Sequence, residues 1–160
     1  MKKRNKKHRP GPVSAVSGLF AIQKKHDDAA MQKPMTEEDI GDLAIAFRLA
    51  FAAMLNGGAD EQQWSTCVVS LNIAMVLAEQ GIGEEYIRQF NDALEGAFRA
   101  RIRANHGSGW GFDGPAQQAI KLAFEAHEAQ LQCSTKREIR DALLEVYRRV
   151  DSGDVFKGSA

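Results

Sequence analysis

The chain has 160 residues, of which 44% are hydrophobic and 26% are charged, as in an ordinary globular protein. No apolar run is long enough to cross a bilayer, and the two cysteines, Cys67 and Cys133, are too few for a disulfide framework. The basic start lacks the apolar stretch of a secretion signal, so we expect a protein of a reducing cytoplasm, and its formal net charge is +0.

Positive charge is concentrated at the N-terminus. Residues 1–25 hold eight basic side chains and no acidic one: Lys2, Lys3, Arg4, Lys6, Lys7, Arg9, Lys24 and Lys25. The rest of the chain carries the other 13 basic side chains against 21 acidic ones, a net charge of −8. Because like charges repel, we predict a flexible basic arm over residues 1–12, tethered to an acidic body. Such an arm either meets a polyanion, folds back on its own acidic body or serves as a solvated tail.

Residues 13–35 connect this arm to the body. Val16, Leu19 and Phe20 have the i, i+3, i+4 spacing of a short helix, although Gly18 weakens it. The stretch from residue 23 to 35 is polar and broken by Pro34, so we predict a linker at which the arm moves relative to the body.

Residues 36–150 show helical periodicity throughout. Five segments place apolar residues on one face: Ile40–Met54, Trp64–Ala78, Tyr86–Ile102, Ala116–Leu131 and Ile139–Val150. Capping residues precede three of them, at Thr36, at Asp60 with Gln63, and at Thr135 with Glu138. No segment alternates polar and apolar residues as a strand does. We therefore predict an all-α protein, a compact bundle of about five helices, followed by a frayed tail over residues 151–160.

A glycine-rich loop over residues 106–114 interrupts the helices. It contains a formal GxGxxG at Gly109, Gly111 and Gly114, but a dinucleotide site needs a strand before that motif, and here a helix precedes it. Trp110 and Phe112 in this loop either plug one end of the bundle or form partner-binding anchors, including a stacking platform for an unpaired base.

Two arginines just before this loop, Arg99 and Arg103, share one helix face. As cations at a helix C-terminus they offset the helix dipole, and they are also second-tier candidates for contact with nucleic acid. His127-Glu128 begins like a zinc motif, but Leu131 stands where the second ligand belongs, so we expect a hydrogen-bonded histidine in the core or at its rim. The sequence predicts no catalytic constellation, metal site or cofactor, and so no enzyme.

Three short segments resemble a loose group of small phage and prophage proteins. Residues 2–10 match their KKRNKK(Y/H)RP-type arm. Residues 122–143 are similar to their "elHdAQl…t.rEl..al" stretch, here at residues 127–131 and 135–138, and Asn72, Ala74 and residues 81–83 are similar to "lnmaeaLa.lGiG". The region between Pro12 and Pro34 matches nothing in the group. The resemblance implies no activity; it implies a bacterial or phage genome, a cytoplasmic setting and an accessory role.

These observations favour a non-enzymatic accessory protein whose basic arm binds nucleic acid, or the nucleic-acid groove of a larger complex. The expected phosphate contacts are Lys2, Lys3, Arg4, Lys6, Lys7 and Arg9. The only helix-turn-helix candidate, residues 127–150, has a second helix that resembles core more than a reading helix.

Two alternatives stay open. An acidic body that imitates a phosphate backbone predicts an inhibitor of a host defence protein, for example an anti-CRISPR protein. The other alternative is a component of the virion or of its assembly. No membrane partner is expected, and a homodimer is left open.

Overall fold

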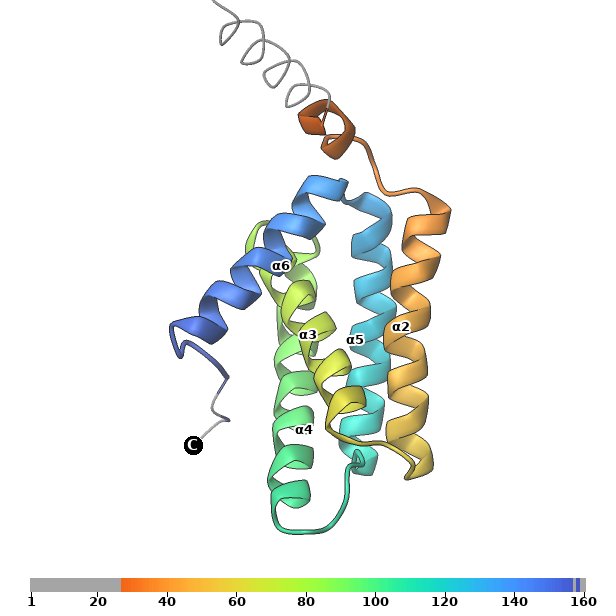
Figure 1. Cartoon of the computed structure of the whole chain (residues 1–160), viewed down its shortest axis with the longest axis vertical. Coiled ribbons are helices and arrows are strands. Elements are labelled where there is room, and N and C mark those ends of the chain that lie inside the picture. Colours follow the sequence, from red (N-terminus) through yellow and green to blue (C-terminus); the bar gives the residue numbers. More distant parts are fainter. Residues whose placement is uncertain (1–26, 157, 159–160) are drawn as a thin grey trace, which may run out of the picture.

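The structure, a computed structural model, describes residues 27–156 and residue 158. Its helices are α2 (Glu37–Asn56), α3 (Glu61–Glu79), the 3-10 turn η1 (Glu84–Tyr86), α4 (Ile87–Asn105), α5 (Gly114–Cys133) and α6 (Lys136–Asp151) (Figure 1). Residues 27–31 add a helical turn, and the described part of the chain contains isolated β-bridges but no strand. The predicted all-α bundle is confirmed.

Local capping explains where the helices begin. Thr36, Asp60 and Thr135 each form a complete capping box, with Asp39, Gln63 and Glu138 respectively at the third helical position. These caps satisfy backbone N–H groups that have no partner inside the helix, which is why short sequence signals located all three starts. At the end of α2, Gly57 adopts a left-handed conformation with φ of 72°.

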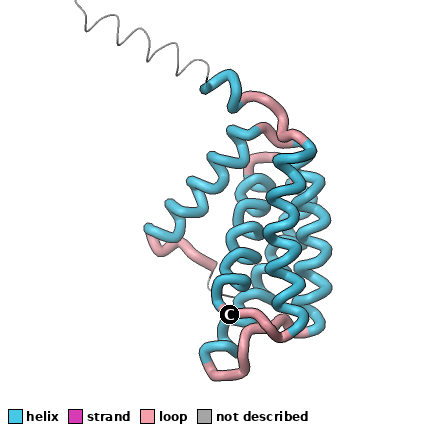
Figure 2. Tube along the Cα trace, turned by 45° about the vertical axis from the view of Figure 1, so that its right-hand side comes forward, coloured by secondary structure: helices cyan, strands magenta, loops and turns pink. Residues whose placement is uncertain are grey.

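Helices α2 to α5 stand side by side, and α6 crosses one end of α3 and then leans away from the bundle (Figures 1 and 2). The centre of the bundle is filled by side chains that are at most 2% exposed, among them Phe47, Leu71, Phe90, Ile120 and Leu131. A smaller cluster of Val76, Leu77, Ala142 and Val146 fixes α6 to α3. Burial of these apolar faces is the main source of the fold's stability.

The end of the predicted linker is held by backbone contacts. The Met35 amide donates to the Ser134 carbonyl at 3.0 Å, and the Lys136 amide donates to the Lys33 carbonyl at 3.1 Å. These bonds form around an antiparallel bridge between Pro34 and Thr135. Residues 33–35, the end of the predicted linker, are therefore attached to the turn between α5 and α6. The predicted arm and the short helix around Val16 lie outside the described residues.

The predicted frayed tail also makes a contact with the body. After α6, the Phe156 ring packs edge-on against Phe98 of α4, with 6.1 Å between ring centroids. Phe156 remains 36% exposed, so the contact is peripheral. Phe156 thus attaches the tail to α4, and the sequence does not indicate this contact because the tail has no helical pattern.

Close packing of α4 on α5 depends on a glycine. A Cβ built on Gly96 of α4 would lie 2.6 Å from the Ala116 Cβ of α5 and 2.9 Å from its Cα. Gly41 in α2 has no atom within 4 Å of the same position. The two glycines therefore separate the effect of packing from that of helix propensity.

We expect Gly96→Ala to lower the free energy of unfolding by about 1–2 kcal/mol, because overpacking outweighs the gain in helix propensity. Gly41→Ala should raise it by about 0.5–1 kcal/mol. Urea denaturation of the two variants measures both changes, and a gain for both would contradict the close approach of α4 and α5.

Candidate functional site

The six predicted phosphate contacts, Lys2, Lys3, Arg4, Lys6, Lys7 and Arg9, lie outside the described residues. The structure does show where the chain that carries them enters the body. Asp28 lies in the helical turn 27–31 and pairs with Arg137 near the start of α6, with 3.2 Å between Arg137 Nη2 and Asp28 Oδ1. The arm is therefore connected to the end of the bundle at which α5 turns into α6.

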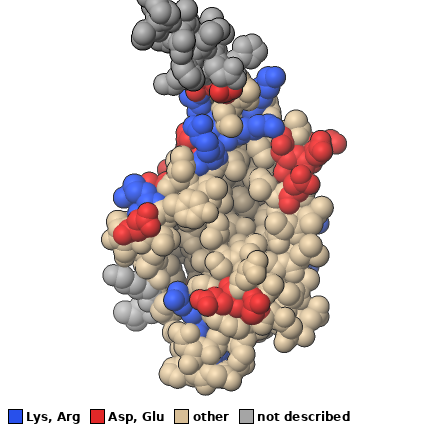
Figure 3. All heavy atoms as spheres, in the orientation of Figure 1, with Lys and Arg blue, Asp and Glu red and all other residues tan. Residues whose placement is uncertain are grey.

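Cations gather at this end of the body (Figure 3), but carboxylates pair with most of them. Lys136 pairs with Asp39 at 2.7 Å, and Arg140 pairs with Asp141 at the same distance. Hydrogen bonds from Lys136 and then from Thr36 lower the pKa of Asp39 to about 2. The Lys136–Asp39 pair links the first turn of α6 to the first turn of α2, so its effect is structural.

Arg99 and Arg103 converge on one carboxylate, that of Asp113. Arg99 Nε lies 3.2 Å and Arg103 Nη1 lies 2.9 Å from Asp113 Oδ2, and Arg103 also donates to the Gly111 carbonyl at 2.9 Å. The hydrogen bond from Arg99, ahead of other causes, lowers the pKa of Asp113. Asp113 in turn caps α5 by accepting from the Ala116 amide.

The two arginines therefore have a structural role that their sequence spacing did not predict. They hold the glycine-rich loop against the start of α5. Their side chains are 40% and 36% exposed, but a phosphate would have to compete with Asp113 for both. Because the carboxylate is 14 and 10 residues from its partners, only the path of the loop brings the three together.

The two loop aromatics behave differently. Phe112 is 6% exposed and packs against Phe51, with 6.0 Å between ring centroids, so it plugs the bundle end. Of the two alternatives for Phe112, the structure shows the plug and not the exposed partner-binding anchor, because burying the phenyl ring removes its apolar surface from water. Trp110 is half-buried and lies 5.4 Å from Trp64, centroid to centroid, with Arg101 over the Trp64 ring. Only its exposed part is available to a partner.

His127 is 3% exposed, so of the two positions left open by the sequence it occupies the core and not the rim. Its Nδ1 lies 3.1 Å from Gln130 Oε1, and Gln130 Nε2 donates to the carbonyls of Ala74 and Ile82. Because the amide hydrogens are used in this way, Oε1 is the acceptor and His127 Nδ1 carries the proton. This network ties α5 to α3 and to the turn before η1, and burial lowers the pKa of His127 to about 4.

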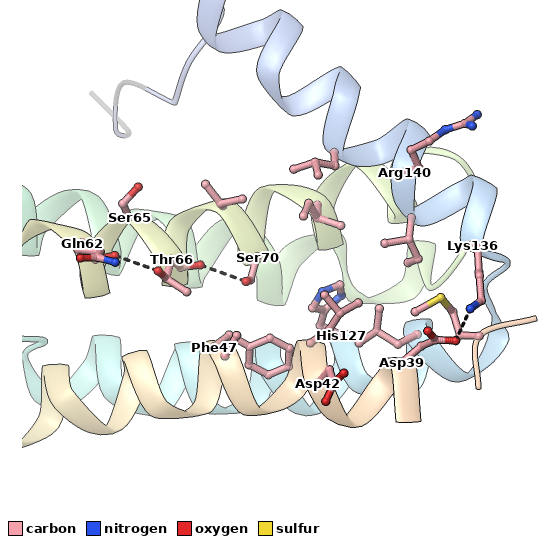
Figure 4. A pocket seen from close by; sticks show the side chains of 18 of the residues that line it. Asp39, Asp42, Phe47, Gln62, Ser65, Thr66, Ser70, His127, Lys136 and Arg140 are labelled. Carbon is pink, nitrogen blue, oxygen red and sulfur yellow. Dashed lines mark hydrogen bonds and ion pairs between the residues drawn. The ribbon is translucent and has the colours of Figure 1, made fainter. Parts of the chain in front are cut away.

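An open groove that the sequence did not indicate lies between α2 and α3 (Figure 4). Its volume is about 1000 Å³; α2 and α3 form its walls, His127 and Leu131 of α5 lie at its floor, and the first turns of α6 close one end. The hydroxyls of Thr66 and Ser70 on its α3 wall donate to carbonyls one turn earlier, at 2.9 and 3.0 Å. These two hydroxyls are therefore used within α3, and the groove is lined by apolar side chains together with polar and charged ones, among them Asp39, Asp42, Glu61, Gln62, Ser65, Lys136 and Arg140.

Groups of three or more metal-ligating side chains do not occur among the described residues. Within the same part of the chain, none of the helices has the length and apolar character needed to cross a membrane. No family model, curated protein or solved structure matches the chain.

The buried His127 makes stability depend on pH. The folded chain keeps the imidazole neutral down to about pH 4, whereas the unfolded chain takes up a proton near pH 6.5. The contribution of this group is therefore complete above pH 6.5 and is lost between pH 6.5 and 4. Between pH 7.5 and 5 the loss should be about 2 kcal/mol.

Urea denaturation at the two pH values checks this expectation. His127→Gln removes the titrating group. Between pH 7.5 and 5, the free energy of unfolding of this variant should therefore fall by about 2 kcal/mol less than that of the wild type. His106→Gln, at an exposed position, is the control and should keep the wild-type pH dependence. An unchanged pH dependence in His127→Gln would show that the histidine is not held neutral by burial.

Proposed function

We propose that this chain is a non-enzymatic accessory protein that binds nucleic acid through its basic arm, residues 1–12, with the helical body as its carrier. The observation that carries the proposal is the distribution of charge. Residues 1–25 hold eight cations and no carboxylate, whereas the remainder has a net charge of −8. The resemblance of residues 2–10 to phage and prophage proteins favours a bacterial cytoplasm as the setting.

Ion pairing within the body supports this division. Eight lysine and arginine side chains pair with carboxylates of the body itself: Arg48, Arg99, Arg103, Lys136, Arg137, Arg140, Arg148 and Arg149. A phosphate would have to displace a carboxylate from each of them. The arm contains no acidic residue that competes in this way. Phosphate contacts are therefore expected from the arm before the body.

The place where the arm joins the body also suits this function. Asp28 holds the chain against Arg137 at one end of the bundle, and residues 33–35 are bonded to the α5–α6 turn. An arm that leaves from either end of the bundle can extend away from most of the acidic surface, and at physiological salt the repulsion by the body is screened beyond about 8 Å.

Salt dependence tests the proposal. If all six cations of residues 2–9 contact phosphates, the plot of log binding constant against log salt concentration for duplex DNA should have a slope of about −5. Replacing the six by glutamine should bring the slope close to zero and weaken binding to unrelated sequences alike. Fluorescence anisotropy with labelled duplexes and single strands measures both quantities.

Matched controls come from the body. Arg88→Gln with Lys121→Gln removes two exposed cations that have no ion pair among the described residues, and it should leave the slope unchanged. Arg99→Gln with Arg103→Gln should lower the free energy of unfolding more than it lowers the free energy of binding to DNA. The proposal fails if wild-type binding is independent of salt, or if the arm variant binds as tightly as the wild type.

A second candidate function rests on the acidic body. Its net charge of −8 repels DNA and is complementary to a basic channel in another protein. This charge favours an inhibitor of a nucleic-acid-binding host protein. In this case the chain would form a stoichiometric complex with a host protein that survives nuclease treatment, and loss of the complex on nuclease treatment would exclude it.

A further inference from the structure

The groove between α2 and α3 leaves apolar side chains uncovered. Leu43 on the α2 wall is 40% exposed, while Val69 and Ile73 on α3 and Leu143 on α6 are half-buried. Phe47 and His127 at the floor are 2% and 3% exposed. An apolar groove of about 1000 Å³ is large enough for the side chains of a short helix or peptide.

The groove exists because the helices around it diverge. The loop at Gly57–Asp60 joins α2 to α3 at one end, and the Lys136–Asp39 pair closes the other end, where α6 begins. Beyond its first turns α6 leans outward (Figure 1), so it covers only that end. A single additional element would cover the remainder.

The N-terminal chain starts at the closed end of this groove. Residue 27 is the first described residue, and the neighbouring Asp28 pairs with Arg137, the residue next to Lys136, which lines the groove. The five residues from position 22 to 27 span up to about 17 Å when extended. Residues 13–22 can therefore reach the length of the groove from this attachment point.

Residues 13–22 match the groove in chemistry and in length. The segment VSAVSGLFAI has no charged residue, and Val16, Leu19 and Phe20 lie on one face at helical spacing. Ten residues of helix extend about 15 Å, close to the roughly 16 Å along α3 between the groove residues Gln62 and Ile73. Lys24 and Lys25 would then lie near Asp42, a rim carboxylate with no ion pair among the described residues.

We propose that residues 13–22 dock in cis as a short amphipathic helix in the groove between α2 and α3, with Val16, Leu19 and Phe20 against its apolar floor. Because the chain enters at the Lys136 end, the basic arm then leaves from the opposite end, beside Glu61. The inference concerns the position of the arm and does not rest on nucleic-acid binding.

Hydrogen exchange of the full chain tests the docking. Amides of residues 16–22 should exchange at least about tenfold more slowly than those of an unstructured segment, and Leu19→Ser with Phe20→Ser should abolish this protection. Ser14→Ala with Ser17→Ala, on positions outside the apolar face, is the matched control and should retain it. These variants lie outside the described body, so the folding of the body itself is not at risk.

Variants in the groove provide a reciprocal test. Leu143→Gln places an amide in the groove, whereas Leu144→Gln changes the adjacent side chain, which is 57% exposed and does not line the groove. Protection of residues 16–22 should fall in the first variant and persist in the second. Equal protection in both, or no protection in the wild type, would overturn the proposal.

A spin label distinguishes docking in cis from docking in a second copy. Cys133→Ser removes the exposed cysteine, so that the label attaches elsewhere. The label is placed at Ser17→Cys, because a cysteine at position 20 would replace the Phe20 ring that is proposed to dock. Broadening of the Val69 and Ile73 signals within the labelled chain supports the proposal. Broadening that appears only in an unlabelled isotopic partner mixed with labelled chain would show that a second copy occupies the groove, and would overturn docking in cis.

Discussion

The attachment of three chain segments to the turn between α5 and α6 determines the layout of this end of the molecule. Backbone bonds fix residues 33–35 to Ser134 and Lys136, the Lys136–Asp39 pair fixes the start of α2, and Arg137 holds Asp28. The entry of the N-terminal chain, the closed end of the groove and the start of α6 therefore share one set of contacts. Disturbing this turn would move all three together.

Charge is divided between the two parts of the chain in a way that the fold reinforces. The guanidinium groups of the body are mostly engaged by its own carboxylates, as Arg99 and Arg103 are by Asp113. Exposed ion pairs of this kind contribute little stability each, but they remove cations from the surface that a polyanion would meet. The arm lies in the longest stretch of the sequence that carries cations and no carboxylate.

Features governed by local sequence could be predicted. The three capping boxes and the glycine that ends α2 depend on residues within one helical turn, so the helix starts and the fold class followed from the sequence. Apolar neighbours at helical spacing also placed His127 on the apolar face, although they did not decide between the core and its rim.

Features that depend on the path of a loop or on the angle between helices could not be predicted. The pairing of Arg99 and Arg103 with Asp113 requires the folded glycine-rich loop, and the sequence left both burial and exposure open for Phe112. The groove was missed for a related reason. Periodicity shows which face of α2 or α3 is apolar, but not whether a neighbouring helix covers it.

The central claim is that the arm, and not the body, contacts nucleic acid, and an NMR titration of the isotopically labelled full chain with a short DNA duplex tests it most directly. The account predicts that the amide signals of residues 2–9 shift first and furthest, while those of α4, α5 and the loop between them stay in place. Shifts concentrated around Arg99, Arg103 and Trp110, with unchanged signals from residues 2–9, would contradict it.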